Sequence, residues 1–257
     1  MSYVIAFAGK GGTGKTTIAG LTIRYLVEKR GKPVLAVDAD SNACLNEALG
    51  VHVHATIGDL REESLETIRS GASRPGGMSS EQLFDYQVQQ SIIESKGFDL
   101  LVMGRPEGPG CYCAANNIIR KYTDKLSDDY NYVVLDNEAG MEHMSRRTTH
   151  KVDLLFIISD PTKKGIQTAK RINSLIDDLK LEIAKRILIV NRVTETDLTD
   201  VENMIKEIDF PVKNVFNVPQ DENIARLDLT GKPVFDLPAD SKAVKGIFGI
   251  LDKLNIP

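Results

Sequence analysis

The residues best suited to chemistry lie near the amino terminus, in the stretch AGKGGTGKTT at positions 8–17. It contains the spacing G-x-x-x-x-G-K-T, whose glycines let backbone N–H groups crowd around phosphate oxygens. A helix that starts here adds favourable positive potential. Lys15 is expected to reach the β- and γ-phosphates of a nucleotide, and the Thr16 hydroxyl to ligate Mg²⁺. We predict that the following residues bind nucleotide: Gly9, Lys10, Gly11, Gly12, Thr13, Gly14, Lys15, Thr16 and Thr17.

The same glycines allow a second interpretation. Gly9, Gly11 and Gly14 also match G-x-G-x-x-G, the dinucleotide fingerprint, and Asp38 stands about where its ribose-binding acid would fall. Two features favour a nucleoside triphosphate instead. One is the Lys-Thr pair at the helix start, which a dinucleotide site does not need. The other is Asp136, which ends the apolar run YVVLD and can hold Mg²⁺ through water.

The early lysine, Lys10, gives the loop the form GKGGTGKTT, which resembles the deviant Walker A loop of the MinD/ParA/nitrogenase iron-protein class. In that class this lysine reaches across a dimer interface to the partner's nucleotide. The resemblance therefore implies an ATPase that acts as a homodimer. VDAD at 37–40 resembles the switch I segment of the class, which implies that Asp38 lies near Mg²⁺ and that Asp40 orients the attacking water. The implied catalytic residues are Lys10, Lys15 and Asp40.

Three later segments fit the same class. DNEAG at 136–140 resembles switch II, which implies that the backbone of Gly140 faces the γ-phosphate. NRV at 191–193 resembles the adenine-reading turn, in which Asn191 pairs its amide with the base edge and Arg192 lies beside it; a simple strand-end turn is the alternative for Asn191. VPQD at 218–221 resembles the second wall of the base pocket and adds Pro219. The implied Mg²⁺ ligands are Thr16, Asp38 and Asp136.

Two of the three cysteines, Cys111 and Cys113, stand one residue apart after Gly-Pro-Gly at 108–110, which predicts a loop. A disulfide between them would close a tiny strained ring, and redox pairs usually have two intervening residues. Residues i and i+2 of an extended segment point the same way, so a bent loop can direct both thiolates to one metal ion. They fill half of a four-coordinate Zn²⁺ or Ni²⁺ site. The other two ligands would come from elsewhere in the chain or from a second chain; the dimer that the resemblance of Lys10 implies would give four sulfurs from two copies.

The segments GRPEGPGCYC and DNEAGMEHMSRRTT resemble the nickel-insertion accessory ATPases of carbon monoxide dehydrogenase and acetyl-CoA synthase, the CooC/AcsF type, over most of the chain. The resemblance implies that Cys111 and Cys113 hold Ni(II) or Zn(II), and that ATP closes the dimer. It further implies that hydrolysis accompanies nickel delivery to one of these client enzymes. Two alternatives stay open: a ParA/MinD-like positioning ATPase acting on DNA or membrane, and an iron–sulfur electron-transfer ATPase like the nitrogenase iron protein.

Short, continuous apolar runs alternate with helical stretches along the chain. Strands buried on both faces of a parallel sheet show this pattern. It predicts an α/β fold with a single doubly wound, mainly parallel sheet of about seven strands flanked by helices. The expected strands are 3–8, 33–38, 98–104, 132–137, 153–159, 186–191 and 212–218, and the clearest helices are 15–29, 163–179 and 198–208.

We expect residues 1–257 to form one domain, interrupted by an inserted loop–helix segment at about 51–97. Within this segment Ser79 and Gln82 have the spacing of a capping box, which predicts a helix that begins there. Near the carboxyl terminus Val244, Ile247, Phe248 and Leu251 form one apolar face, which is expected to pack on the sheet.

The net charge is −4, so no basic field draws the chain toward nucleic acid or an anionic membrane. No apolar run suits a signal peptide or a membrane span, and three cysteines cannot form a disulfide framework. We therefore expect a cytoplasmic protein with neither DNA nor membrane as partner. Cys44 is expected to be buried in a helix, and His52 and His54 to lie on an exposed edge. The role of His143, beside the DNEAG segment, is left open.

Overall fold

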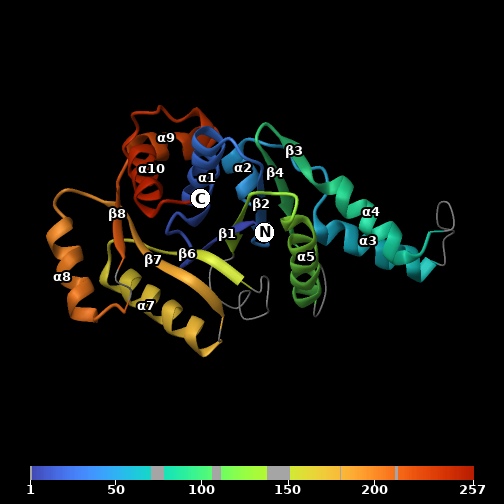
Figure 1. The fold of residues 1–257 in the computed structure, drawn as a ribbon, viewed down its shortest axis with the longest axis horizontal. Coiled ribbons are helices and arrows are strands. Elements are labelled where there is room, and N and C mark those ends of the chain that lie inside the picture. Colours follow the sequence, from blue (N-terminus) through green and yellow to red (C-terminus); the bar gives the residue numbers. More distant parts are fainter. Residues whose placement is uncertain (1, 71–77, 106–110, 138–150, 180, 212–213) are drawn as a thin grey trace.

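The computed structural model describes the backbone of residues 2–70, 78–105, 111–137, 151–179, 181–211 and 214–257 (Figure 1). Its centre is an eight-stranded sheet with the order β3-β4-β2-β5-β1-β6-β7-β8. Neighbouring strands are parallel except for the antiparallel pair β3 and β4. The strands are β1 (Tyr3–Gly9), β2 (Val34–Ala39), β3 (Ile93–Ser95), β4 (Phe98–Val102), β5 (Tyr132–Asn137), β6 (Lys151–Ser159), β7 (Glu182–Val193) and β8 (Val215–Pro219).

This sheet confirms the predicted α/β fold, with one strand more than the expected number. The additional strand is β3, whose three residues are too few to form a recognisable apolar run. Its position at the edge, antiparallel to β4, follows from a tight turn that brings the chain directly back into the sheet.

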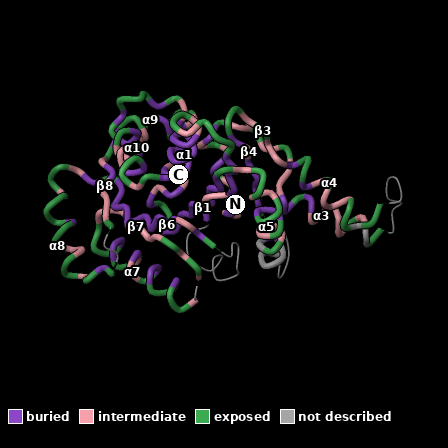
Figure 2. Tube along the Cα trace, in the orientation of Figure 1, coloured by how far each residue is buried: buried purple, intermediate pink, exposed green. Residues whose placement is uncertain are grey.

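Helices cover both faces of the sheet (Figures 1 and 2). Along β1, Ile5 and Phe7 point into one hydrophobic core, whereas Val4 and Ala6 point into the other, because successive side chains of a strand alternate. The first core is closed by α1 (Lys15–Tyr25), α2 (Leu45–Leu49), α9 (Glu222–Thr230) and α10 (Lys242–Leu254). The second is closed by α3 (Ile57–Ser70), α4 (Ser80–Ser91), α5 (Cys111–Ser127), α7 (Lys163–Asp178) and α8 (Leu198–Ile208).

The inserted segment contains more helix than the sequence indicates. Its predicted helix is α4, and the capping box is confirmed: Ser79 Oγ accepts from the Gln82 N–H at 3.1 Å, and Gln82 Oε1 accepts from the Ser79 N–H at 2.9 Å. The helix α3 was not expected from the sequence. Figure 1 shows that α3 and α4 together extend away from the sheet at its β3–β4 end.

The carboxyl-terminal helix α10 packs as expected. Val244, Ile247 and Leu251 are buried against β8 and α1, and the Phe248 ring meets the Tyr25 ring edge-on with centroids 5.1 Å apart. The apolar face of α10 is therefore occupied by the protein's own core. Within the described part of the chain, no helix has both the length and the apolarity needed to cross a bilayer.

Candidate nucleotide-binding site

The predicted phosphate loop connects the carboxyl end of β1 to the amino end of α1. Thr13 folds back on the loop, where its hydroxyl and its N–H both donate to the Lys10 carbonyl, at 2.8 and 3.4 Å. Lys15 opens α1 and is only 7% exposed, while Lys10 and Gly11 lie at the exposed rim. The buried lysine and the helix start thus face the sheet edge where parallel strands end, the usual ligand edge of such folds.

Gly14 occupies a position where a side chain would be strained and would collide. Its φ is +91°, and an added Cβ atom would lie 2.5 Å from Asn191 Nδ2. Gly12 has a similar φ of +79°, but an added Cβ would meet nothing within 4 Å. The two glycines therefore separate backbone strain from steric collision.

We expect Gly12→Ala to cost about 1–2 kcal/mol of unfolding free energy in the ligand-free protein, the usual cost of the left-handed conformation. Gly14→Ala is expected to cost more, because the Asn191 amide must also move away from the loop. Urea unfolding of both variants without nucleotide measures the difference. Equal losses would show that the Asn191 contact has no energetic weight.

Two buried carboxylates lie next to the loop. Asp38 and Asp136 are directly opposite each other in the register of β2 and β5, and they are 0% and 1% exposed. Burial and the charge of Asp136 raise the pKa of Asp38 to about 7, although the N–H groups of Leu45 and Asp40 donate to its oxygens at 2.9 and 3.0 Å. Burial raises the pKa of Asp136 to about 6, against the opposing influence of the Thr16 hydroxyl and Lys15.

This pair suits a divalent cation. Asp136 Oδ1 is buried and has no hydrogen-bond partner among the described residues. A buried carboxylate oxygen without a hydrogen-bond partner, beside a second buried carboxylate, forms a negatively charged site that a bound cation would stabilise. Mg²⁺ prefers oxygen ligands and binds through one or two carboxylates together with phosphate oxygens. The side chains of Thr16, Asp38 and Asp136 therefore fit the Mg²⁺ role expected of them.

Asp40 lies at the rim of this group. It is partly exposed, and its Oδ1 accepts from the backbone N–H and the side-chain amide of Asn42 at 2.9 and 3.2 Å. Its charge contributes to the raised pKa values of both Asp38 and Asp136, which places it close to the cation site. Such a carboxylate, accessible to water and held by its neighbour, has the properties required to orient a water molecule.

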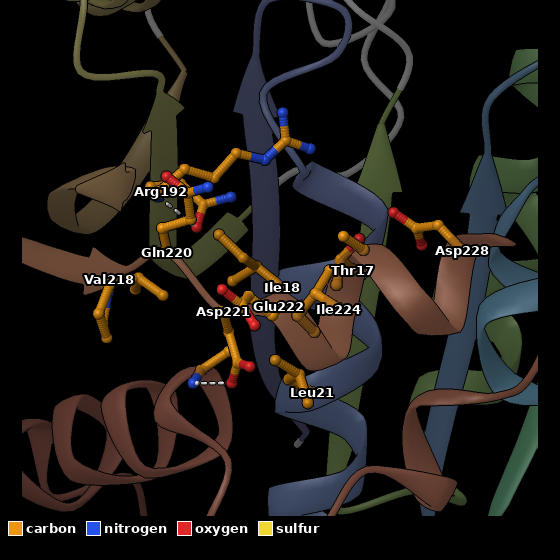
Figure 3. A pocket seen from close by; sticks show the side chains of 14 residues that line it. Thr17, Ile18, Leu21, Arg192, Val218, Gln220, Asp221, Glu222, Ile224 and Asp228 are labelled. Carbon is orange, nitrogen blue, oxygen red and sulfur yellow. Dashed lines mark hydrogen bonds between the residues drawn. The ribbon is translucent and has the colours of Figure 1, made fainter. Parts of the chain in front are cut away.

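A pocket of about 170 Å³ opens beside the start of α1 (Figure 3). Asn191 and Arg192 from the end of β7 and Pro219 from β8 line it, together with Thr17 of α1. The predicted adenine-binding residues therefore meet around one cavity next to the phosphate loop. Gln220 also lines it, as expected of the VPQD segment, whereas the other lining residues, which include Ile18, Leu21, Glu222, Ile224 and Asp228, were not predicted from the sequence.

Asp221, also at this pocket, has a structural role that the sequence analysis missed. Its carboxylate accepts from the N–H groups of Asn223 and Ala243 at 2.8 and 2.9 Å and from the Ser241 hydroxyl at 2.5 Å. Burial alone would raise the pKa of Asp221, but these hydrogen bonds hold it below the usual range. One side chain thus caps α9 and joins it to the start of α10. The sequence signal was a capping Asp two residues after the end of a strand.

Replacing Asp221 with asparagine is expected to cost about 1–3 kcal/mol of unfolding free energy at pH 7, because charge-assisted hydrogen bonds are lost. The pKa of this group is depressed in the folded state. Its stabilisation is therefore complete above the unfolded pKa of about 4 and disappears as the pH falls through the folded pKa. Urea unfolding should show the difference between wild type and Asp221→Asn shrinking from pH 7 toward pH 3. A constant difference would contradict this assignment.

The structure changes the interpretation of the cysteine segment. Cys111 and Cys113 form the first turn of α5, not the loop predicted from Gly-Pro-Gly, because the helix begins directly after those residues. Positions two apart in a helix are separated by about 200° around its axis. Cys111 and Cys113 therefore lack the i, i+2 relation of an extended segment. Gly140 and His143 lie outside the described residues.

Cys44 is exposed, so the expectation of a buried helix residue was wrong. It stands just before α2, where Leu45 turns into the core instead and Cys44 Sγ faces the Asn42 carbonyl at 3.7 Å. His52 and His54 are both exposed, as predicted, with ring centroids 5.0 Å apart. In the described part of the chain, neither belongs to a group of three potential metal ligands.

Two relatives show how far the similarity extends. An uncharacterised ATP-binding protein of Methanocaldococcus jannaschii is 40% identical over 251 residues, which are 98% of each chain. The carbon monoxide dehydrogenase accessory protein CooC of Rhodospirillum rubrum is 32% identical over 242 residues, which are 91% of this chain and 89% of CooC.

Solved structures share the fold. A ParA family ATPase from Chlorobium tepidum has a TM-score of 0.73 with 21% identity, covering 100% of both chains. The septum site-determining protein MinD of Pyrococcus horikoshii, in complex with Mg-ADP, has a TM-score of 0.69 with 20% identity, covering 99% of this chain and 96% of MinD. Residues 4–234 match the family described as the CobQ/CobB/MinD/ParA nucleotide binding domain. The chain therefore belongs to this family of P-loop ATPases, and it binds and hydrolyses ATP.

Proposed function

We propose that this chain is a homodimeric metallochaperone that couples ATP hydrolysis to the delivery of Ni(II), held by Cys111 and Cys113, to carbon monoxide dehydrogenase or acetyl-CoA synthase. Its similarity to CooC, whose name gives it a carbon monoxide dehydrogenase accessory role, supports this choice of client. Each chain offers two thiolates, half of a four-coordinate site, so a symmetric dimer completes the metal's coordination.

One observation carries the coupling between nucleotide and metal. The N–H of Met103 donates to the backbone carbonyl of Asp38 at 2.8 Å, and the Met103 carbonyl accepts from the N–H of Gly58 at 2.8 Å. Met103 is buried at the end of β4, eight positions before Cys111. Met103 is thus tied to the strand end that presents the Asp38 carboxylate.

In this proposal the phosphate loop and Lys15 bind the triphosphate, and Thr16, Asp38 and Asp136 hold Mg²⁺. Lys10, exposed at the rim, reaches the nucleotide of the partner subunit, while Asp40 orients water for in-line attack. ATP bridges two subunits and favours the metal-holding dimer, and hydrolysis removes that preference.

Metal titration tests the ligand assignment. We expect the wild type to bind about one Ni²⁺ or Zn²⁺ per dimer, as a shared tetrathiolate site requires. Cys111→Ser/Cys113→Ser should lose this binding, while Cys44→Ser, a matched change of an exposed thiol, should keep it. Each protein is measured with and without a non-hydrolysable ATP analogue. Unchanged metal binding in the double variant would refute the assignment of ligands. Wild-type protein that contains iron and sulfide, and no nickel or zinc, would indicate the electron-transfer alternative.

A further inference from the structure

The strand β7 is irregular where it reaches the nucleotide site. Val190 pairs with Asn217 and Val193 pairs with Pro219, so β7 advances by three residues while β8 advances by two. This bulge contains Asn191 and Arg192. The backbone of Arg192 has a φ of +61°, a value that residues other than glycine rarely adopt. Such a conformation persists where surrounding contacts hold it, often at functional sites.

The contacts of this bulge are with the phosphate loop. Asn191, which is 8% exposed, donates from Nδ2 to the Thr13 carbonyl at 2.9 Å. Arg192 donates from Nη1 to the Gly12 carbonyl at 3.2 Å. The Arg192 N–H in turn donates to Asn191 Oδ1 at 3.0 Å. Figure 3 shows the Arg192 side chain extending toward the start of α1. Two successive loop carbonyls are therefore held by two successive residues of β7.

Holding these carbonyls orients the loop's donors. In a trans peptide the C=O and N–H of one plane point in opposite directions. Because Thr13 O faces Asn191, the N–H of Gly14 in the same plane points to the other side, into the loop that receives phosphate. The Gly12 carbonyl fixes the preceding plane, whose N–H, that of Thr13, donates within the loop to the Lys10 carbonyl. A donor set that is oriented before binding lowers the cost of binding an anion.

We propose that Asn191 and Arg192 are positioning residues that hold the phosphate loop in its binding conformation. They do this in addition to lining the base pocket, so their effect reaches the triphosphate whether or not a base is present. Asn191 uses its oxygen for the Arg192 N–H and one amide hydrogen for Thr13, which leaves one amide hydrogen to face a base. This proposal depends on the ATPase site alone and is independent of the nickel assignment.

Inorganic tripolyphosphate with Mg²⁺ distinguishes positioning from base reading, because it has no base. We expect Arg192→Ala and Asn191→Asp to weaken both ATP and tripolyphosphate binding by about tenfold. Arg192→Ala loses the charge-assisted hydrogen bond to the Gly12 carbonyl, and Asn191→Asp places a carboxylate oxygen against the Thr13 carbonyl oxygen. Arg192→Lys, which keeps the charge, should restore part of the loss. The matched control is Gln220→Ala, which lines the pocket and should weaken ATP alone. The proposal that these residues hold the loop is overturned if Arg192→Ala and Asn191→Asp weaken ATP binding but leave tripolyphosphate binding unchanged.

Hydrogen exchange of the ligand-free protein gives a readout that needs no ligand. Amides in the segment 10–17 should exchange several-fold faster in Arg192→Ala and Asn191→Asp than in the wild type, as expected when a loop loses its restraints. Gln220→Ala should leave exchange in this segment unchanged, and far-UV circular dichroism confirms that each variant is folded. Wild-type exchange in both variants would also overturn the proposal, whatever the metal titration shows.

Discussion

Replacing Lys15 with alanine is expected to reduce ATP hydrolysis by about 100- to 1,000-fold, the usual loss when one donor to developing charge is removed. Lys15 is buried at the start of α1, and its charge lowers the pKa of Asp136. Steady-state phosphate release at saturating Mg·ATP measures the effect.

The matched control for this change is Lys29→Ala, which removes an exposed lysine from the short π-helix (Leu26–Arg30) that follows α1. It should leave hydrolysis within about twofold of the wild type, as is typical for surface substitutions far from a site. Lys15→Ala hydrolysing ATP at the wild-type rate would place the triphosphate somewhere other than this loop.

Replacing Asp40 with alanine is expected to separate hydrolysis from binding. If Asp40 orients water, the rate of the chemical step should fall by about 100- to 10,000-fold, the range for loss of a positioned acid–base group. Nucleotide binding should be kept. Since Asp40 contributes to the raised pKa values of Asp38 and Asp136, its removal lowers both values and makes the carboxylates better Mg²⁺ ligands. Single-turnover hydrolysis and direct titration with Mg·ATP measure the two effects.

Asn42→Ala serves as the partner variant. It removes the side-chain hydrogen bond to Asp40 at 3.2 Å but keeps the backbone one at 2.9 Å, so we expect an intermediate loss of rate. If Asp40→Ala lost ATP binding in the same proportion as hydrolysis, Asp40 would be a binding residue and the role in orienting water would be wrong.

The sheet was accessible from sequence because its signals are local. Continuous apolar runs identified β1, β2, β5 and β6 to within a few residues, and the glycine spacing identified the phosphate loop. The elements that were missed had weaker or misleading local signals. The helix α5 begins immediately after a Gly-Pro-Gly segment, and β3 has only three residues. Cys44 and Leu45 are adjacent, and only packing decides which one is buried.

By itself, then, the sequence determined which residue types the nucleotide site contains and that a parallel sheet presents them. These follow from the spacing of the phosphate loop and from strands that end in Asp38, Asp136 and Asn191. Only the tertiary structure decided how those residues act on one another. The charge of Asp136 raises the pKa of Asp38 because β2 and β5 are adjacent and in register. Asn191 and Arg192 reach the phosphate loop because β7 bulges where it passes β8. Both depend on contacts between segments far apart in the chain, and a local pattern does not encode those contacts.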